Sequence, residues 1–279
     1  METKPEANVE VREIRLLVSS YYEIQKLRIQ NSNRMKMLER DYEISEDQAK
    51  DYHETVIKAL VVTEKDIEKR VRKYVRKQHI FARWIGPHVK GVAELLAGAM
   101  LSGIEDIGKF ANVAKLWKYC GVGLNDDKSI QKRRRGEKIN YSPFLKTACW
   151  KIGESFVKTG DRGYYGKMYA KYKADEVRKL TEQGFTILPA EEVKKKIEEA
   201  VKLDKNAAYQ NLGLFSQGHV HNRAKRKTVK LFLSHLWTVW REMEDLPVTE
   251  PYIIANEPEK HSYYAPPGWD KEPTTTIIL

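Results

Sequence analysis

The residues of this chain best suited to a chemical task form a basic run between positions 128 and 138. The run is almost entirely polar and contains six cations: Lys128, Lys132, Arg133, Arg134, Arg135 and Lys138. Three adjacent arginines that face only water repel one another, whereas guanidinium groups bind phosphate oxygens through paired hydrogen bonds. A solvated surface loop is the alternative. The charge density favours an anionic partner, and we expect this exposed loop to contact a nucleic-acid backbone.

A second cationic cluster lies on the helix predicted near the C-terminus. Arg223, Arg226, Lys227 and Lys230 gather on the N-terminal half of this helix, which also carries an apolar stripe that predicts a buried face. The stripe indicates core packing. We expect this cluster, and Arg223, Arg226 and Lys227 in particular, to extend the phosphate-binding surface that the basic loop begins.

A glycine-proline pair marks a third place where phosphate could bind. Gly86 and Pro87 follow a predicted helix, and a helix rich in alanine and glycine resumes at Val89. This unit resembles a helix-hairpin-helix motif, in which a glycine turn presents backbone N–H groups to a phosphate without reading the base sequence. The motif usually has a second glycine where this chain has His88. We expect Gly86, His88 and Lys90 to contact DNA; a turn without a phosphate contact is the alternative.

Residues that could support other chemistry are sparse. Cys120 and Cys149 are too few for a disulfide framework, lack the spacing of a zinc site, and lie in apolar surroundings typical of buried thiols. His219, His221 and His235 have no carboxylate or thiol nearby in the sequence, so capping or core roles are expected. We therefore predict no metal site and no resident cofactor.

The overall charge agrees with a polyanionic partner. The 279 residues include 50 Lys and Arg against 39 Asp and Glu, a formal net charge of +11. This excess is typical of nucleic-acid-binding proteins, although ribosomal and membrane-surface proteins share it. No run of about 20 apolar residues predicts a membrane span, and the polar N-terminus does not resemble a signal peptide. We expect a cytoplasmic protein, associated with the nucleoid if its source is prokaryotic.

The elements that must carry these groups are helical. Two long runs, 9–40 and 45–78, have apolar residues at three- and four-residue steps and contain neither glycine nor proline. They predict a coiled-coil-like helical hairpin. Ser45, with Gln48 three residues later, predicts a capping box at the start of the second helix. The hairpin could pair only with itself, but we favour a homodimer formed through its apolar seams.

The expected fold is all-α, with a long N-terminal helical hairpin followed by a compact helical domain. The predicted segments are a hairpin arm (1–77), a helical core with the helix-hairpin-helix-like unit (78–174), a charged helical insertion (175–217), a closing helix (218–246) and a disordered tail (247–279). Charges of alternating sign in the insertion are typical of a helix laced with ion pairs. The tail is rich in proline and threonine and has no periodicity. Within the core, the helix at 143–157 is expected to bury Trp150 with its apolar neighbours.

The order of these parts resembles a known family. The hairpin is followed by Ile85-Gly86-Pro87, Leu95-Leu96-Ala97, Asp106-Ile107-x-x-Phe110, Leu116-x-x-Tyr119-x-Gly121, the Lys-Arg-Arg-Arg-Gly run, and a hydrophobic helix ending near Trp150. The last helix adds His221-Asn222-Arg223 and Arg226-Lys227. This order resembles the C-terminal half, or transposase-20 domain, of transposases of the insertion-sequence 110/116/902 type. The likeness covers roughly residues 69–157 well and 218–242 more loosely.

The resemblance implies a role with DNA in recombination, transposition or mobile-element biology. Family members carry an acidic ribonuclease-H-like domain and a serine, just ahead of the basic run, that attacks DNA. Ser129 stands at about that place, but its surroundings, Lys128-Ser129-Ile130-Gln131, differ from the Ser-Ser-Gly-like signature of the family. No acidic domain precedes the hairpin in this sequence. A serine hydroxyl needs a base or a metal to take its proton, and phosphodiester attack needs divalent ions.

Two main interpretations follow. In the favoured one, the chain binds the phosphate backbone of DNA and has no strand-transfer activity of its own. In the other, Ser129 is the nucleophile of a recombinase whose acidic, Mg²⁺-binding site comes from a separate nuclease-domain partner. A helical scaffold that assembles with proteins is a third option. The sequence does not determine whether the partner is DNA or RNA, or whether it is duplex or branched. It also contains no element that would recognise particular bases.

Overall fold

The computed structural model describes residues 5–41, 44–125, 129–133, 135–136, 138–203, 212–249 and 264–269. Most of these residues are helical and few are in strands, so the predicted all-α fold is confirmed. Contacts between residues divide the chain into two compact units. The first comprises Met1–Gly86 and Val92–Asp106, and the second comprises Pro87–Gly91 and Ile107–Leu279.

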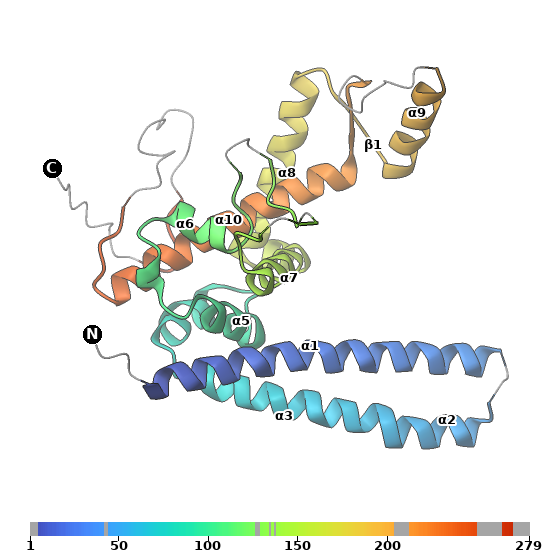
Figure 1. The fold of residues 1–279 in the computed structure, drawn as a ribbon. Coiled ribbons are helices and arrows are strands. Elements are labelled where there is room, and N and C mark those ends of the chain that lie inside the picture. Colours follow the sequence, from blue (N-terminus) through green and yellow to red (C-terminus); the bar gives the residue numbers. More distant parts are fainter. Residues whose placement is uncertain are drawn as a thin grey trace. The chain divides into compact units, whose positions relative to one another are not determined.

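The first unit is built on the predicted helical hairpin. Helix α1 (Pro5–Arg40) lies beside a second helical segment made of α2 (Glu46–Tyr52), a π-helical turn η1 (His53–Ile57) and α3 (Lys58–Val75), as Figure 1 shows. The capping box at Ser45 is present: the Gln48 backbone N–H donates to Ser45 Oγ at 3.3 Å, and the Ser45 N–H donates to Gln48 Oε1 at 3.0 Å. The pair Ser45 and Gln48 was therefore enough to predict where the second helix begins.

Small and branched apolar residues hold the base of the hairpin together. Val18 of α1 and Val71 of α3 are fully buried, and helix α5 (Glu94–Ile104) packs against both helices. Gly98 makes this approach possible, because a Cβ at this position would lie 2.7 Å from Val71 Cγ1. The hairpin is therefore closed at its base by a third helix.

The connection between α3 and α5 differs from the prediction. Gly86 has helical angles (φ −56°, ψ −55°), and its N–H donates to the carbonyl oxygen of Phe81, so Gly86-Pro87 does not break the helix. A π-helical turn η2 (Phe81–Ile85) runs directly into α4 (Gly86–His88). The turn follows later, at Gly91 (φ +105°), and the next helix begins at Glu94 rather than at Val89. The helix-hairpin-helix assignment is not confirmed, because the N–H group of Gly86 is already used inside the helix.

The second unit is a helical core around three helices. Its elements are η3 (Ile107–Lys109), α6 (Val113–Tyr119), α7 (Pro143–Thr159), η4 (Gly160–Arg162), α8 (Tyr164–Glu182), β1 (Thr186–Leu188), α9 (Ala190–Leu203), β2 (Leu214–Ser216) and α10 (Gln217–Met243). Helices α7, α8 and α10 pack against one another (Figure 1). Their rings meet at Phe156, Tyr165 and Phe232, with centroids 4.7–5.6 Å apart. The apolar stripe predicted on α10 is therefore core.

Trp150 departs from the prediction of a buried face on α7. Its side chain is 58% exposed, whereas Leu145, Cys149, Ile152 and Phe156 are buried. The buried residues recur at three- and four-residue steps, and Trp150 is five residues from Leu145, about 140° around the helix. The tryptophan therefore lies on the outer face of α7.

The charged segment 175–217 also contains structure that was not expected. Strands β1 and β2 pair in parallel, with Ile187 opposite Phe215, and α9 lies in the connection between them. The helix α9 carries the expected ion pairing, with Lys194 Nζ 3.8 Å from Glu198 Oε1. The insertion is thus a small strand–helix–strand unit at the end of α8.

Part of the stretch after Leu246 packs on α10. The indole Nε1 of Trp269 donates to Glu242 Oε2 at 2.5 Å, and Tyr264 contacts His235. The rest of the predicted tail, 250–263 and 270–279, lies outside the described residues. None of the described helices combines the length and the hydropathy that a membrane-spanning segment needs.

Candidate nucleic-acid interface

The basic loop rests on a buried anchor at Gln131. This side chain is 1% exposed, and its Nε2 donates to Asn140 Oδ1 at 3.0 Å, which joins the two arms of the loop. Lys146 of α7 donates from Nζ to the Gln131 carbonyl oxygen at 2.5 Å. Gly121 (φ +69°) leaves room for this lysine, since a Cβ there would be 2.9 Å from Lys146 Cδ. The base of the loop is therefore fixed to α7.

The cations of the loop face solvent. Lys132, Arg133, Arg135 and Lys138 are all exposed, and no carboxylate in the described part of the chain pairs with any of them. The other two predicted cations, Lys128 and Arg134, lie outside the described residues. A set of exposed cations without internal counter-charges can neutralise phosphates at little cost in desolvation.

Two of the predicted α10 cations are engaged inside the protein. Arg223 Nη1 donates to Glu176 Oε1 at 2.5 Å, and Lys227 Nζ donates to Glu176 Oε2 at 2.7 Å. Burial raises the pKa of the Glu176 carboxyl, but the hydrogen bonds and charges of Lys227 and Arg223 outweigh burial and lower it overall. One carboxylate thus serves two partly exposed cations, which leaves one positive charge in excess.

Arg226 continues this positive surface. Burial, together with the charge of Arg223, lowers the pKa of Arg226, and burial with the charge of Arg226 lowers the pKa of Lys230 one turn later. The Lys230 Nζ also lies 4.8 Å from the centre of the Trp117 ring. Because each cation disfavours the charge on the next, an anion bound here would relieve their repulsion. Lys230, which the sequence placed in the same basic cluster, follows Arg226 at an i, i+4 spacing and therefore lies on the same face of α10.

The residues predicted to form the hairpin turn belong to two different compact units. Gly86 falls in the first unit, and its N–H is occupied by Phe81. His88 and Lys90 fall in the second unit and are exposed. Gly268 packs against the His88 ring, where a Cβ on the glycine would lie 2.1 Å from Nδ1. His88 is therefore partly covered by a segment distant in sequence.

Ser129 sits at the start of the arm that leads into the basic loop. Leu124 and Ile130 form an antiparallel bridge, and the Asn125 N–H donates to the Ser129 carbonyl oxygen at 2.9 Å. Asn125 Nδ2 donates to Ser129 Oγ at 3.0 Å, which orients the hydroxyl, but an amide N–H cannot accept its proton. Asp126 and Asp127 lie outside the described residues. Within the described ranges, no cluster of His, Cys, Asp and Glu forms a ligand set for a metal ion.

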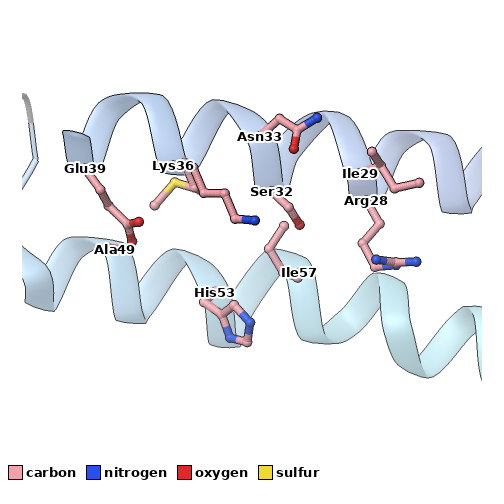
Figure 2. Close-up of a pocket in the computed structure, with 10 residues that line it drawn as sticks. Arg28, Ile29, Ser32, Asn33, Lys36, Glu39, Ala49, His53 and Ile57 are labelled. Carbon is pink, nitrogen blue, oxygen red and sulfur yellow. The ribbon is translucent and has the colours of Figure 1, made fainter. Parts of the chain in front are cut away.

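A separate hollow of about 420 Å³ lies in the hairpin, between α1 and the segment formed by α2 and η1. Figure 2 shows Ser32 of α1 and Ile57 of η1 pointing toward each other across it. Its lining mixes Lys36, Glu39 and His53 with apolar groups. This combination supplies neither a metal-ligand set nor a concentration of one charge.

Residues 87–165 match the family model of the transposase IS116/IS110/IS902 family. This transposase-family segment contains α5, α6, Ser129, the basic loop and α7. The resemblance inferred from the sequence is therefore confirmed over this segment, and it indicates a transposase-related role in transposition. A search of curated proteins and a search of solved structures found no match.

Proposed function

We propose that this chain is a DNA-binding protein of transposition that grips the phosphate backbone through the basic loop of its transposase-family segment. One contrast between the cations supports this proposal above all. Arg28 is bonded to Glu64 at 2.6 Å and Arg76 to Glu94 at 2.8 Å, whereas the loop cations Lys132, Arg133 and Arg135 have no such partner in the described part of the chain. Cations that cost stability through repulsion gain most from an external polyanion.

The cations of α10 extend the phosphate-binding surface of the basic loop. Arg226 and Lys230 present partly buried charge, and Arg223 with Lys227 keeps a surplus over Glu176. Lys128 and Arg134 add to the loop by their position in the same run. The contacts proposed here are made to phosphate oxygens, so binding should be largely independent of base sequence.

The proposal is tested by a binding panel at several salt concentrations. Linear duplex, a four-way junction, single-stranded DNA and a structured RNA of similar length are titrated with the full chain. Contact with about six phosphates predicts that log affinity falls against log salt with a slope near −5. Affinity that does not change with salt, or tighter binding to RNA than to every form of DNA, would overturn it.

A second function is favoured by one observation. Ser129 lies inside the transposase-family segment, and Asn125 fixes the direction of its hydroxyl. In this alternative Ser129 attacks a DNA end, and a separate chain supplies the carboxylates that hold Mg²⁺. A covalent protein–DNA adduct that forms with partner and Mg²⁺, and disappears in Ser129→Ala, would support it. The same adduct in Ser129→Ala would exclude it.

We further infer that the hairpin pairs with that of a second copy. Val9, Leu16 and Leu27 of α1 are 66%, 66% and 46% exposed. Their spacings of 7 and 11 residues are close to two and three full turns, so the three side chains share one face of the helix. Sedimentation of wild type as a dimer, and of Leu16→Glu/Leu27→Glu as a monomer, would support this pairing; a monomeric wild type would refute it.

A further inference from the structure

A small open hollow in the second unit lies beside the base of the basic loop. Its volume is about 170 Å³, and the apolar residues Val122, Ile130 and Val229 of α10 contribute to its lining. Pockets for drug-sized ligands measure roughly 300–1,000 Å³. The hollow therefore suits one flat ring system better than a larger ligand.

The wall of the hollow includes the exposed Trp150. This ring is held from one side by Lys225, whose Nζ lies 5.3 Å from the ring centre. Lys225 is itself fixed, because it is bonded to Glu154 and its stem packs on Gly153, where a Cβ would be 2.7 Å from Lys225 Cγ. The indole is thus a supported surface that remains open to solvent. Large apolar side chains left open at a hollow are typical of binding sites.

Positive charge surrounds this apolar surface. Arg226 and Lys146 contribute to the lining, and Ile130 connects the hollow directly to the arm that carries Lys132 and Arg133. Lys146 uses one of its three donors on the neutral Gln131 carbonyl, which leaves two donors for an anion. Among the residues that the structure describes, no carboxylate contributes to the lining. A hollow with an apolar and aromatic lining and cations around it is complementary in polarity and charge to a nucleic-acid base and its flanking phosphates.

We infer that this hollow binds one unpaired base of DNA, which stacks on Trp150 while Arg226, Lys146 and the loop cations hold the adjacent phosphates. Base stacking on an aromatic side chain tolerates any base, because every base has a flat face, and it adds to electrostatic binding of the backbone. A fully paired duplex offers no free base to this slot. The inference rests on the proposed DNA binding and adds a preference for single-stranded or distorted DNA.

The test uses a single-stranded oligonucleotide with a central 2-aminopurine, and the same strand annealed to its complement. On binding to the full chain, stacking should quench 2-aminopurine in the single strand and leave the duplex signal nearly unchanged. Trp150→Ala should weaken single-strand binding by roughly 5- to 150-fold, the range measured for the loss of one base–aromatic stack. Its duplex affinity should stay within about twofold of wild type. Trp150→Phe should restore most of the single-strand affinity.

Val177→Ala is the matched control, since Val177 is an exposed apolar residue on α8 that does not line the hollow. It should bind both DNAs as wild type does. If wild type binds duplex but Trp150→Ala also binds the single strand normally, the stacking inference is overturned and the proposed function stands. If wild type binds neither DNA, both fail. Because Trp150 is mostly exposed, circular dichroism should show that Trp150→Ala and Trp150→Phe keep their helix content.

Discussion

The imidazole Nε2 of His235 lies 2.7 Å from the carbonyl oxygen of Tyr264. A carbonyl only accepts hydrogen bonds, so Nε2 must carry the ring proton. The other nitrogen, Nδ1, then accepts from the Tyr165 hydroxyl at 2.8 Å. The neutral ring therefore links α8 and α10 to residues 264–269, and a second proton, on Nδ1, would stop that nitrogen from accepting from Tyr165 and would place a charge in a buried site.

This link predicts a stability that falls in mild acid. Burial lowers the pKa of His235 from 6.5 to about 4, although the bond to Tyr264 raises it slightly. The unfolded chain therefore binds the proton first, and the free energy of unfolding should decrease as pH falls from 6.5 towards 4. A shift of this size corresponds to a few kcal/mol. Thermal unfolding followed between pH 7 and pH 4 should show this loss, and His235→Gln should show a smaller pH dependence over the same range.

Glu176 forms ion pairs with two cations of α10, and we expect these ion pairs to weaken the binding of DNA. Glu176→Gln removes the charge that pairs with Arg223 and Lys227, whose side chains are 36% and 49% exposed. We expect a loss of about 1–2 kcal/mol in stability, reduced by solvent screening, and a rise of a few-fold in DNA affinity. Urea denaturation and DNA titration measure the two effects. Glu182→Gln, an exposed change of equal charge on the same helix, should alter both much less; equal effects would contradict the role of Glu176.

The contact of α5 with the hairpin should tolerate no added side chain at Gly98. Gly98→Ala places a methyl group 2.7 Å from Val71 Cγ1 in a fully buried seam, and overpacking of this kind costs about 1–3 kcal/mol. Thermal unfolding should show the loss. Gly218→Ala is the control, because a Cβ there meets only Ser216 Oγ at 4.0 Å near the start of α10. A Gly98→Ala protein as stable as wild type would show that α5 packs less tightly than described.

The features that the sequence predicted correctly depend on interactions between residues that are close together in the sequence. The hairpin follows from apolar spacing without glycine or proline, and Ser45 caps α2 through Gln48 three residues away. Cys120 and Cys149 are buried, as their apolar surroundings predicted. The exposed loop cations Arg133 and Arg135 also follow from a local run of charge.

The features that sequence missed depend on contacts between distant residues. Strand β1 pairs with β2 across 28 positions, from Thr186 to Leu214, and each strand is too short for a period to show. The chain does not turn at Gly86 as predicted, because the preceding π-helical turn continues and the Gly86 N–H donates to the Phe81 carbonyl oxygen. The sequence could not predict the hydrogen bonds from Arg223 and Lys227 to Glu176, because Glu176 precedes these residues by 47 or more positions in the sequence.

The central claim is that exposed loop cations bind DNA phosphates, and the salt dependence of duplex binding tests it most directly. Affinities of wild type and Arg133→Ala/Arg135→Ala are measured at four or more salt concentrations. Lys195→Ala/Lys196→Ala removes the same charge from the exposed face of α9 and serves as control. The loop variant should bind more weakly, with a log–log slope shallower by about 2, and the control should match wild type. A loop variant with the affinity and slope of wild type would contradict the account.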